Sequence, residues 1–338
     1  MRVAVAGLGF MGSTHIRALQ SIPEAELVAV CSSDEKKLAG DLSAVQGNLG
    51  GPGELLDFGG VARYRDIRQM LDDPRIEAVD LCLPTHLHTP VAIQAFEAGK
   101  HVLVEKPMAL DAASARQMIA EAGKLKRVLM VAQVLRFFPM YQALQRVLKR
   151  DEMGTTRSAI FRRRCAAPAW SAWLADPEQS GGGVFDLLIH AVDMCLHLFG
   201  APEAISATGH EALASGIDVI TAILHYPGQR TATITGGWHH PKAYPFLMEY
   251  TVVADGGTVE YSSLDRPPAL YSADGEREAL VMEEVDGYRA EIEYFLNCCR
   301  RGTSPELCKP EDSANAVAVT RLMLEARKRN GGKIPCEL

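Results

Sequence analysis

Residues 3–12 read VAVAGLGFMG, an apolar stretch of strand length followed directly by a Gly-x-Gly-x-x-Gly turn. Ile16 and Leu19 then continue the apolar pattern at helical spacing. In such a strand–turn–helix unit the first glycine makes the tight turn, the second lets the backbone approach a pyrophosphate, and the third lets the helix pack on the strand. The free N–H groups at the start of the helix favour an anion. The sequence therefore predicts a dinucleotide site at Gly7, Gly9, Phe10, Met11 and Gly12.

The composition of the whole chain fits a soluble globular protein. Of 338 residues, 47% are hydrophobic and 23% are charged, a balance and length that allow about two domains. The 42 acidic residues exceed the 35 basic ones, and the net charge of −7 favours neither nucleic acid nor anionic lipid as a partner. No apolar run of about 18 residues stands out and no basic leader precedes Val3, so we expect a cytoplasmic protein without a membrane span.

Neither the cysteines nor the histidines have the spacing of a typical metal site. The eight cysteines are scattered and form no Cys-x-x-Cys pair, so we expect reduced, buried thiols rather than a disulfide framework or a zinc ribbon. His190, Asp193 and His197 share one helical stripe that could in principle ligate a metal. Such a trio more often forms a hydrogen-bonded polar face, and we therefore expect no metal.

The first 135 residues alternate short apolar runs with amphipathic stretches. This order is typical of βαβ units, in which helices cover both faces of a parallel sheet. Asp111 precedes an alanine-rich stretch and Pro90 occupies a first-turn position, and both are signals of a helix start. The predicted strands are Val3–Ala6, Leu27–Cys31, Ala78–Leu83, His101–Glu105 and Val128–Gln133.

From about residue 155 the pattern changes to longer β-rich runs separated by turns such as Pro227-Gly228. These runs predict an antiparallel sheet with strands at 155–164, 204–208, 219–226, 231–238, 246–254 and 257–261. Two helices follow, at about 287–301 and 310–328. The predicted fold class is α/β: a Rossmann domain with a doubly wound parallel sheet over 1–122, and an α+β domain with a large open antiparallel sheet over 123–338.

Residues 46–60, QGNLGGPGELLDFGG, have no periodic pattern. Six glycines and one proline are too many for a packed element, so we predict a mobile loop. A tolerated surface insertion explains it most simply, although loops of this length often act as lids.

The position that normally binds the adenosine ribose lacks its usual acid. An acidic residue about 20 positions after the glycine turn accepts hydrogen bonds from the ribose hydroxyls, and Ser32 occupies that place here. Asp34 either reaches the ribose or caps the next helix, which is the simpler interpretation. Hydroxyls and lysines suit a 2′-phosphate better than a 2′-hydroxyl. The sequence thus favours NADP over NAD, with contacts from Ser32, Ser33, Lys36 and Lys37.

Several further motifs are spread over nearly the whole chain. They are Gly7-x-Gly9-x-x-Gly12-x-x-His15, Pro84-Thr85-His86-Leu87-His88, the run from Ala98 to Glu105-Lys106-Pro107, Arg136-Phe137-Phe138-Pro139, and Gly181-Gly182-Gly183 followed by Asp186, His190, Asp193 and Gly200. In this combination the chain resembles the Gfo/Idh/MocA family of NAD(P)-dependent oxidoreductases, the glucose-fructose oxidoreductase and inositol dehydrogenase group.

The resemblance implies an NAD(P)-dependent dehydrogenase or reductase acting on a sugar, cyclitol or related polyhydroxy compound. It implies reaction-centre roles for Lys106, Asp186 and His190. His15 fits a family position near the cofactor phosphates and His88 one at the nicotinamide loop, both as binding groups. The other predicted cofactor contacts are Pro84, Thr85, Glu105 and Lys106. The predicted substrate contacts are Lys106, Arg136, Trp173, Asp186 and His190.

The chemistry of alcohol oxidation independently asks for such groups. The hydride goes to the nicotinamide and the hydroxyl proton goes to a base, and a histidine near neutral pKa suits this exchange. Asp186 lies four residues before His190, where a carboxylate on the same helix face can orient the imidazole. Lys106 would stabilise the developing alkoxide. Taken alone, Lys106 also fits a solvated strand-end charge, and the other two fit an ordinary helix pair.

The segment before the triple glycine should border the substrate. Alternation along a strand points Arg162 and Arg164 to one face and Arg163 to the other, and a solvated outer strand is the simpler interpretation. Trp173 is predicted to stack on an apolar sugar face, although a tryptophan packed on a helix has the same pattern. The His239-His240 pair lies either at a subunit interface or at the outer edge of the substrate cleft.

Two other functions stay open at this stage. Some proteins similar to this family retain NAD and cleave glycosides by transient oxidation, and a non-catalytic NADP(H) sensor needs only the dinucleotide turn. The presence of Lys106, Asp186 and His190 together argues against a sensor. An open sheet leaves one face uncovered, and large apolar faces usually mark an interface, so we expect a homodimer or homotetramer.

Overall fold

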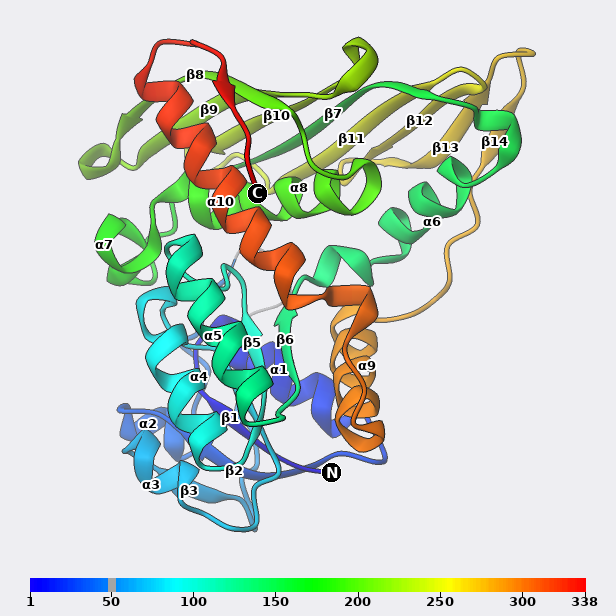
Figure 1. Ribbon diagram of the computed structural model, residues 1–338. Coiled ribbons are helices and arrows are strands. Elements are labelled where there is room, and N and C mark those ends of the chain that lie inside the picture. The colour runs from blue at the N-terminus through cyan, green and yellow to red at the C-terminus, as the bar shows by residue number, and fades with distance from the viewer. Residues whose placement is uncertain (48–52) are drawn as a thin grey trace. The chain divides into compact units, whose positions relative to one another are not determined.

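The computed structural model describes residues 1–47 and 53–338, and it divides into two compact units (Figure 1). The first unit comprises Met1–Val134 and Asp286–Ala314, and the second comprises Leu135–Val285 and Asn315–Leu338. The predicted boundary after residue 122 differs from this division, because it falls inside helix α5 (Ala112–Lys124), before the last strand of the parallel sheet.

A parallel sheet of six strands in the order β3-β2-β1-β4-β5-β6 forms the centre of the first unit. The order reverses between β1 and β4, and ligands of open α/β sheets bind at the carboxyl ends of the strands beside such a switch point. The five predicted strands are confirmed, whereas the short β3 has no apolar run to reveal it. The strands are β1 (Arg2–Ala6), β2 (Glu26–Cys31), β3 (Ala62–Tyr64), β4 (Ala78–Leu81), β5 (His101–Glu105) and β6 (Leu129–Ala132).

The helices of the first unit pack in two groups, with α4 against α3 and α5, and α1 against α9. Helix α9 comes from the far end of the sequence, and its packing on α1 explains why Asp286–Ala314 belongs to this unit. Asp111 caps α5 as predicted, because its carboxylate accepts the Ser114 N–H at 2.8 Å. The helices are α1 (Phe10–Gln20), α2 (Glu35–Leu38), α3 (Ile67–Leu71), α4 (His88–Glu97), α5 and α9 (Gly287–Arg301), with short 3₁₀ turns η1 (Thr85–Leu87) and η7 (Glu306–Cys308).

Part of the predicted mobile loop, residues 48–52, lies outside the described residues. Both flanks of that part contact α1. A Cβ at Gly47 would lie 2.2 Å from the Phe10 ring, and Glu54 accepts a hydrogen bond from Arg17 at 2.8 Å. Asp41 and Leu55 also form an isolated antiparallel bridge. The described flanks of the loop are therefore packed against the first unit.

The second unit contains a nine-stranded sheet in the order β14-β13-β12-β11-β7-β10-β9-β8-β15. The predicted antiparallel sheet is confirmed, except that β10 pairs with β7 in parallel. Strand pairing over such a sequence distance leaves no local signal. The strands are β7 (Thr156–Cys165), β8 (Ala204–Ala212), β9 (Ile217–His225), β10 (Thr231–Trp238), β11 (Leu247–Ala254), β12 (Gly257–Ser262), β13 (Arg266–Ser272), β14 (Arg277–Ala279) and β15 (Ile334–Pro335).

Helix α8 (Gly183–Phe199) packs on β7, β9 and β10, while α6 (Pro139–Leu148) packs on β12 and β13 (Figure 1). The predicted helices at 287–301 and 310–328 are confirmed as α9 and α10 (Pro310–Lys328), and a short α7 (Pro177–Ser180) precedes α8. Contrary to the expectation from the sequence, residues 177–199 include a stretch of 18 residues that is long and apolar enough to span a membrane. Of this stretch, 72% is buried inside the protein, as in a core helix.

Candidate functional site

The glycine turn joins β1 to α1, and its three glycines meet different surroundings. Gly7 has a φ of +95°, and a Cβ there would lie 2.2 Å from the carbonyl oxygen of Cys82. A Cβ at Gly12 would lie 1.9 Å from the carbonyl oxygen of Gly7. Both positions are therefore restricted to glycine by the fold. At Gly9, apart from the backbone of the turn and helix itself and the adjoining residues, no described atom lies within 4 Å of the Cβ position, which fits the approach of a ligand to the second glycine.

The N-terminus of α1 suits an anion. Gly9 occupies the N-cap, no side chain in the described part of the chain caps it, and the first turn contains no acidic residue. The N–H groups of this 11-residue helix and the positive end of its dipole thus have no local counter-charge. The pyrophosphate of a dinucleotide fits this chemistry. Phe10 and Met11 are half-buried in the same turn, and their cofactor contacts stay predictions.

Asp34 caps helix α2. Its carboxylate accepts hydrogen bonds from the N–H of Lys36 at 2.9 Å and of Lys37 at 3.3 Å, which favours the simpler of its two interpretations. The hydroxyl of Ser32 accepts the N–H of Asp34 at 3.1 Å. This segment is therefore ordered by its own side chains. Contacts of Ser32 and the two lysines with a cofactor stay predictions.

Arg65 lies near this segment, although nothing in the sequence singles it out. It follows β3, whose last residue Tyr64 pairs with Cys31 at the end of β2. Its guanidinium contacts the carboxylate of Glu35 at 2.5 Å, and both side chains are exposed. A guanidinium therefore stands at Glu35, the first residue of α2.

His15 is enclosed within the first unit. The residue is 0% exposed, its Nδ1 lies 2.8 Å from Asp80, and its Nε2 lies 3.2 Å from Glu105. Its position near the cofactor phosphates stays a prediction. Burial is the largest effect and opposes protonation of the imidazole, but the Asp80 carboxylate and the Cys82 thiol together outweigh it and raise the pKa of His15 well above its ordinary value.

The His88 side chain is also enclosed. It is 1% exposed, with Nδ1 2.8 Å from the carbonyl oxygen of Pro107 and Nε2 2.8 Å from that of Leu83. The cofactor contact of His88 stays a prediction. Burial lowers the pKa of His88, so the neutral ring donates to one of the two carbonyls. The ring fixes the loop after β4 to the loop after β5.

Lys106 directly follows β5 at the carboxyl edge of the parallel sheet, where ligands of such sheets bind. The residue is half-buried, and its N–H donates to Oε2 of Glu105 at 3.0 Å. Glu105 itself is turned inward and is 6% exposed. Pro84 precedes the 3₁₀ turn that begins at the buried Thr85. The cofactor and catalytic roles of these residues stay predictions.

In the second unit, Asp186 lies in the first turn of α8 and His190 follows one turn later. The four-residue spacing puts them on one helix face. Within residues 183–195, Asp186 is the one residue that is not buried. His190 is 7% exposed. Helix α8 therefore presents Asp186 toward the surface of an otherwise enclosed segment, and the catalytic roles of both residues stay predictions.

Arg136 forms a buried ion pair with Asp193 of α8. The guanidinium donates two hydrogen bonds to this carboxylate, at 2.9 and 2.7 Å, and the two side chains are 2% and 1% exposed. The Arg136 side chain is turned into the protein in this pair, and its substrate contact stays a prediction. His197 lies 2.6 Å from Gln145 through its Nε2. Asp193 and His197 thus lie in polar pairs, as the polar-face interpretation expects.

The start of α8 is held by Asp218, a residue that motif analysis missed. Its carboxylate accepts the N–H of Val184 at 2.8 Å and a hydrogen bond from Arg327 at 2.6 Å. A Cβ at Gly183 would lie 2.3 Å from the Trp238 ring, so this glycine allows the helix to touch the tryptophan. Asp218 is the one carboxylate in the otherwise mainly apolar strand β9. Because buried charges are paired, its place in the sequence indicates that it has a partner in the fold.

The segment before α8 follows the predicted alternation. Arg163 is 5% exposed on the helix-covered face of β7, whereas Arg162 contacts Glu249 of β11 at 2.8 Å. Trp173 is half-buried in the 3₁₀ turn η4 (Ala172–Ala175). The ring of His240 stacks on Tyr244, with centroids 3.9 Å apart. The stacking role of Trp173 and the two alternatives for the histidine pair stay predictions.

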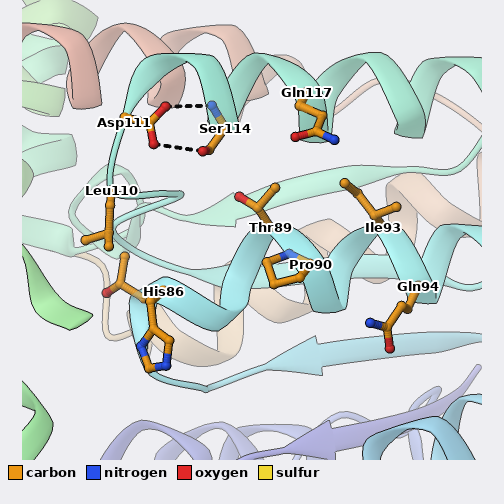
Figure 2. A pocket seen from close by; sticks show the side chains of 10 residues that line it. His86, Thr89, Pro90, Ile93, Gln94, Leu110, Asp111, Ser114 and Gln117 are labelled. Carbon is orange, nitrogen blue, oxygen red and sulfur yellow. Dashed lines mark hydrogen bonds between the residues drawn. The ribbon is translucent and has the colours of Figure 1, made fainter. Parts of the chain in front are cut away.

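An open groove of about 430 Å³ lies in the first unit between α4 and α5 (Figure 2). Thr89 and Ile93 of α4 line one side, and Gln117 of α5 lines the other. Asp111 and Ser114, joined by the capping hydrogen bonds, lie at the start of α5. Since this lining omits Gly7, Gly9 and Gly12, the groove is distinct from the glycine turn.

Comparisons with known proteins agree with this geometry. Residues 1–133 match the Gfo/Idh/MocA oxidoreductase family with its NAD-binding Rossmann fold, and residues 141–260 match the C-terminal domain of the same family. Trans-1,2-dihydrobenzene-1,2-diol dehydrogenase of Mus musculus is 30% identical over 99% of this chain and 98% of its own. D-apiose dehydrogenase of Paraburkholderia graminis is 27% identical, covering 96% of this chain and 87% of its own.

The fold is shared with solved structures as well. Levoglucosan dehydrogenase, solved in complex with NADH and L-sorbose, aligns with a TM-score of 0.85 and 18% identity over 100% of this chain and 99% of that one. The two family matches follow one another along the chain and together cover most of it. The protein therefore belongs to the Gfo/Idh/MocA family of NAD(P)-dependent oxidoreductases.

Proposed function

We propose that the protein transfers a hydride between NADP or NAD and a secondary alcohol or ketone of a sugar, cyclitol or related polyhydroxy compound. The observation that carries the proposal is the start of α1, where the N-terminus has no cap among the described residues and the Cβ position of Gly9 is open. Relatives named as dehydrogenases of D-apiose and of myo-inositol support the substrate class.

Each predicted residue has a separate task. The nicotinamide, when bound, accepts or supplies the hydride. The backbone from Gly7 to Gly12 holds the pyrophosphate at the start of α1. The Lys106 ammonium stabilises negative charge on the substrate oxygen. His190 takes the hydroxyl proton during oxidation and returns it during reduction, and Asp186 orients its imidazole.

NADP is the preferred cofactor in this proposal. Ser32 stands where an acid would repel a 2′-phosphate, and Lys36 and Lys37 follow it. Arg65, brought beside this segment by β3, adds a third cation. A phosphate is bound best by several charge-assisted donors of this kind. Ser32→Asp should therefore shift the preference toward NADH in a fluorescence titration.

We also infer a cytoplasmic homodimer or homotetramer that uses neither nucleic acid nor a membrane as a partner. The net charge of −7 supports the last point. Ile160 of β7 and Val253 of β11 are 39% and 36% exposed on neighbouring strands of the nine-stranded sheet. Exposed apolar residues grouped on one sheet face favour an interface. Light scattering that gives a monomer at working concentration would contradict this assembly.

The test is turnover with a panel of sugars and polyols, followed at the nicotinamide absorbance band. Lys106→Met and His190→Asn should each lower turnover about 10²- to 10⁴-fold. In His190→Asn the Kd of the cofactor should change less than about threefold. Lys124→Met, at a lysine whose side chain is 69% exposed on α5, is the control and should be active. Release of a leaving group without net absorbance change would replace the proposal with glycoside hydrolysis.

The pH profile separates the roles within α8. The rate of alcohol oxidation should rise with pH through one ionisation, because the neutral imidazole of His190 is the acceptor. This rise of the oxidation rate with pH should be absent in His190→Asn. Asp186→Asn should be intermediate, because its amide still offers a hydrogen bond but no negative charge. An unchanged profile with near-normal turnover in His190→Asn would show that the base is another group.

A further inference from the structure

Three charged side chains meet inside the first unit. His15 of α1 lies between Asp80 of β4 and Glu105 of β5, with Nδ1 2.8 Å from Oδ2 of Asp80 and Nε2 3.2 Å from Oε1 of Glu105. The His15, Asp80 and Glu105 side chains are 0%, 2% and 7% exposed, respectively. Three groups of this kind are rarely enclosed without a reason, because removing charges from water is costly.

The geometry favours an imidazolium. A neutral imidazole carries a proton on one nitrogen only, whereas the protonated ring carries one on each. Nδ1 is hydrogen-bonded to Asp80, while Nε2 lies at ion-pair distance from Glu105 without hydrogen-bond geometry. Burial is the largest effect and opposes the charge, but Asp80 and Cys82 together outweigh it and raise the pKa of His15. The other titratable groups facing the ring are Cys82, whose Sγ is 3.6 Å from Nδ1, and Tyr288 of α9, whose ring centroid is 6.2 Å away. Neither carries a positive charge that would compete.

Glu105 connects this buried group to the predicted catalytic lysine. Its Oε1 faces His15, and its Oε2 accepts the N–H of Lys106 at 3.0 Å. One carboxylate therefore joins helix α1, three residues beyond Gly12, to the backbone at the end of β5. A shift of Glu105 would move the main chain from which the Lys106 side chain extends.

We propose that His15 is a positioning residue: its imidazolium holds Glu105, and Glu105 holds the backbone of Lys106 in place for the reaction. The inference rests on the proposed function, because Lys106 is the residue being positioned. A metal held by His15, Asp80 and Cys82 is the other arrangement that this grouping allows. The 2.8 Å separation of Nδ1 and Oδ2 is a hydrogen-bond distance, whereas two ligand atoms on one tetrahedral zinc stand roughly 3.3 Å apart.

The kinetic test compares two replacements of Glu105. Glu105→Gln keeps an oxygen that accepts the Lys106 N–H and an amide facing His15, so its kcat should be at least about threefold higher than that of Glu105→Ala. Glu105→Ala removes both contacts and should lower kcat at least about tenfold. The Kd of NADPH, measured without substrate, should differ less than about threefold between the two variants, so that cofactor binding does not account for the difference in kcat. Equal kcat values for Glu105→Ala and the wild type would overturn the proposal.

Cys82→Ala is the matched control, because it alters the same cluster without touching the bridge between His15 and Lys106. It should retain kcat within about threefold. Elemental analysis accompanies it: a stoichiometric metal in the wild type that is lost in Cys82→Ala would replace the proposal with a metal centre.

The protonation state is tested without any substrate, so this result stands even if the proposed dehydrogenase activity fails. In protein labelled with ¹⁵N-histidine, the His15 ring should show two protonated nitrogens above pH 6.5, where most free imidazole is neutral. The signal should be absent from His15→Gln, which identifies it. A neutral His15 in the wild type would overturn the bridge, whereas absence of turnover on every substrate would count against the proposed function alone.

Discussion

Helices α1 and α8 both begin after a glycine-rich segment, but the backbone N–H groups at their N-termini have different surroundings. The first turn of α1 has no acidic residue, and its N-cap is Gly9, next to open space. The first turn of α8 is closed by Asp218, which accepts the Val184 N–H and is held by Arg327. A glycine run therefore does not identify an anion site. What decides is whether the protein already supplies a carboxylate to the N–H groups.

The largest loss of stability is expected at the N-terminus of α8. Asp218→Ala leaves the 8% exposed Arg327 without its buried partner and the start of α8 without its acceptor. Breaking such a pair costs about 3–5 kcal/mol, so the free energy of unfolding of the second unit should fall by about that amount. Urea unfolding followed by a signal from the second unit measures it.

Glu211 provides the control for Asp218. It contacts the same guanidinium, but its side chain is 49% exposed. Glu211→Ala should cost less than about 1 kcal/mol, as exposed ion pairs do. Similar losses for Asp218→Ala and Glu211→Ala would mean that α8 does not depend on a closed N-terminus.

A substitution at the N-terminus of α1 should change cofactor binding rather than the stability of the protein. Gly9→Ala adds a methyl group where no described atom lies within 4 Å, and the φ of −84° suits alanine. The free energy of unfolding should change by less than about 1 kcal/mol. The added methyl group should nevertheless weaken NADPH binding about 10- to 100-fold, because it blocks the approach of the pyrophosphate.

Gly12→Ala is the opposite case within the same turn. Its Cβ would lie 1.9 Å from the carbonyl oxygen of Gly7, so the main effect of this variant should be a lower free energy of unfolding. Calorimetry and fluorescence titration on both variants separate the two effects. If Gly9→Ala binds NADPH as tightly as the wild type, the cofactor does not lie against this glycine.

The same contrast shows what the sequence can and cannot predict. The strand β5 and the helix α9 have the predicted bounds, because apolar period and cap residues are local signals. The parallel pairing of β7 with β10 and the partner of Arg136, 57 residues away, depend on contacts that no local pattern records. The burial of His15 could be predicted from the sequence, since this residue shares a helix face with Ile16 and Leu19, both buried.

Stability should also depend on pH through the first unit. The pKa of His15 is raised in the folded protein, because Asp80 and Cys82 together outweigh the opposing burial. A raised pKa contributes stability that is complete below the unfolded value of about 6.5 and is lost as the pH rises toward the folded value. Between the two pKa values the loss should approach about 1.4 kcal/mol per pH unit.

Other titratable groups do not cancel this dependence of the free energy of unfolding on pH. Burial lowers the pKa of His88 and of His101, so their contributions change below pH 6.5 and have the opposite sign. The raised pKa of a buried thiol such as Cys82 acts only near pH 9 and above. Urea unfolding at steps from pH 6 to 8 should therefore show a gap between the wild type and His15→Gln that narrows as the pH rises. A constant gap would mean that His15 does not titrate with unfolding.

The smallest effect concerns Asp34, which closes the N-terminus of α2 much as Asp218 closes that of α8. Its carboxylate accepts the Lys36 and Lys37 N–H groups. Asp34→Ala should cost about 1 kcal/mol, and Asp34→Asn should cost less, because asparagine is an equally good N-cap. If capping is its whole role, the Kd values of NADH and NADPH should each change less than about threefold in both variants. A selective loss of NADH affinity in Asp34→Ala would instead show that this carboxylate binds the ribose, and the preference for NADP inferred from Ser32 would then be wrong.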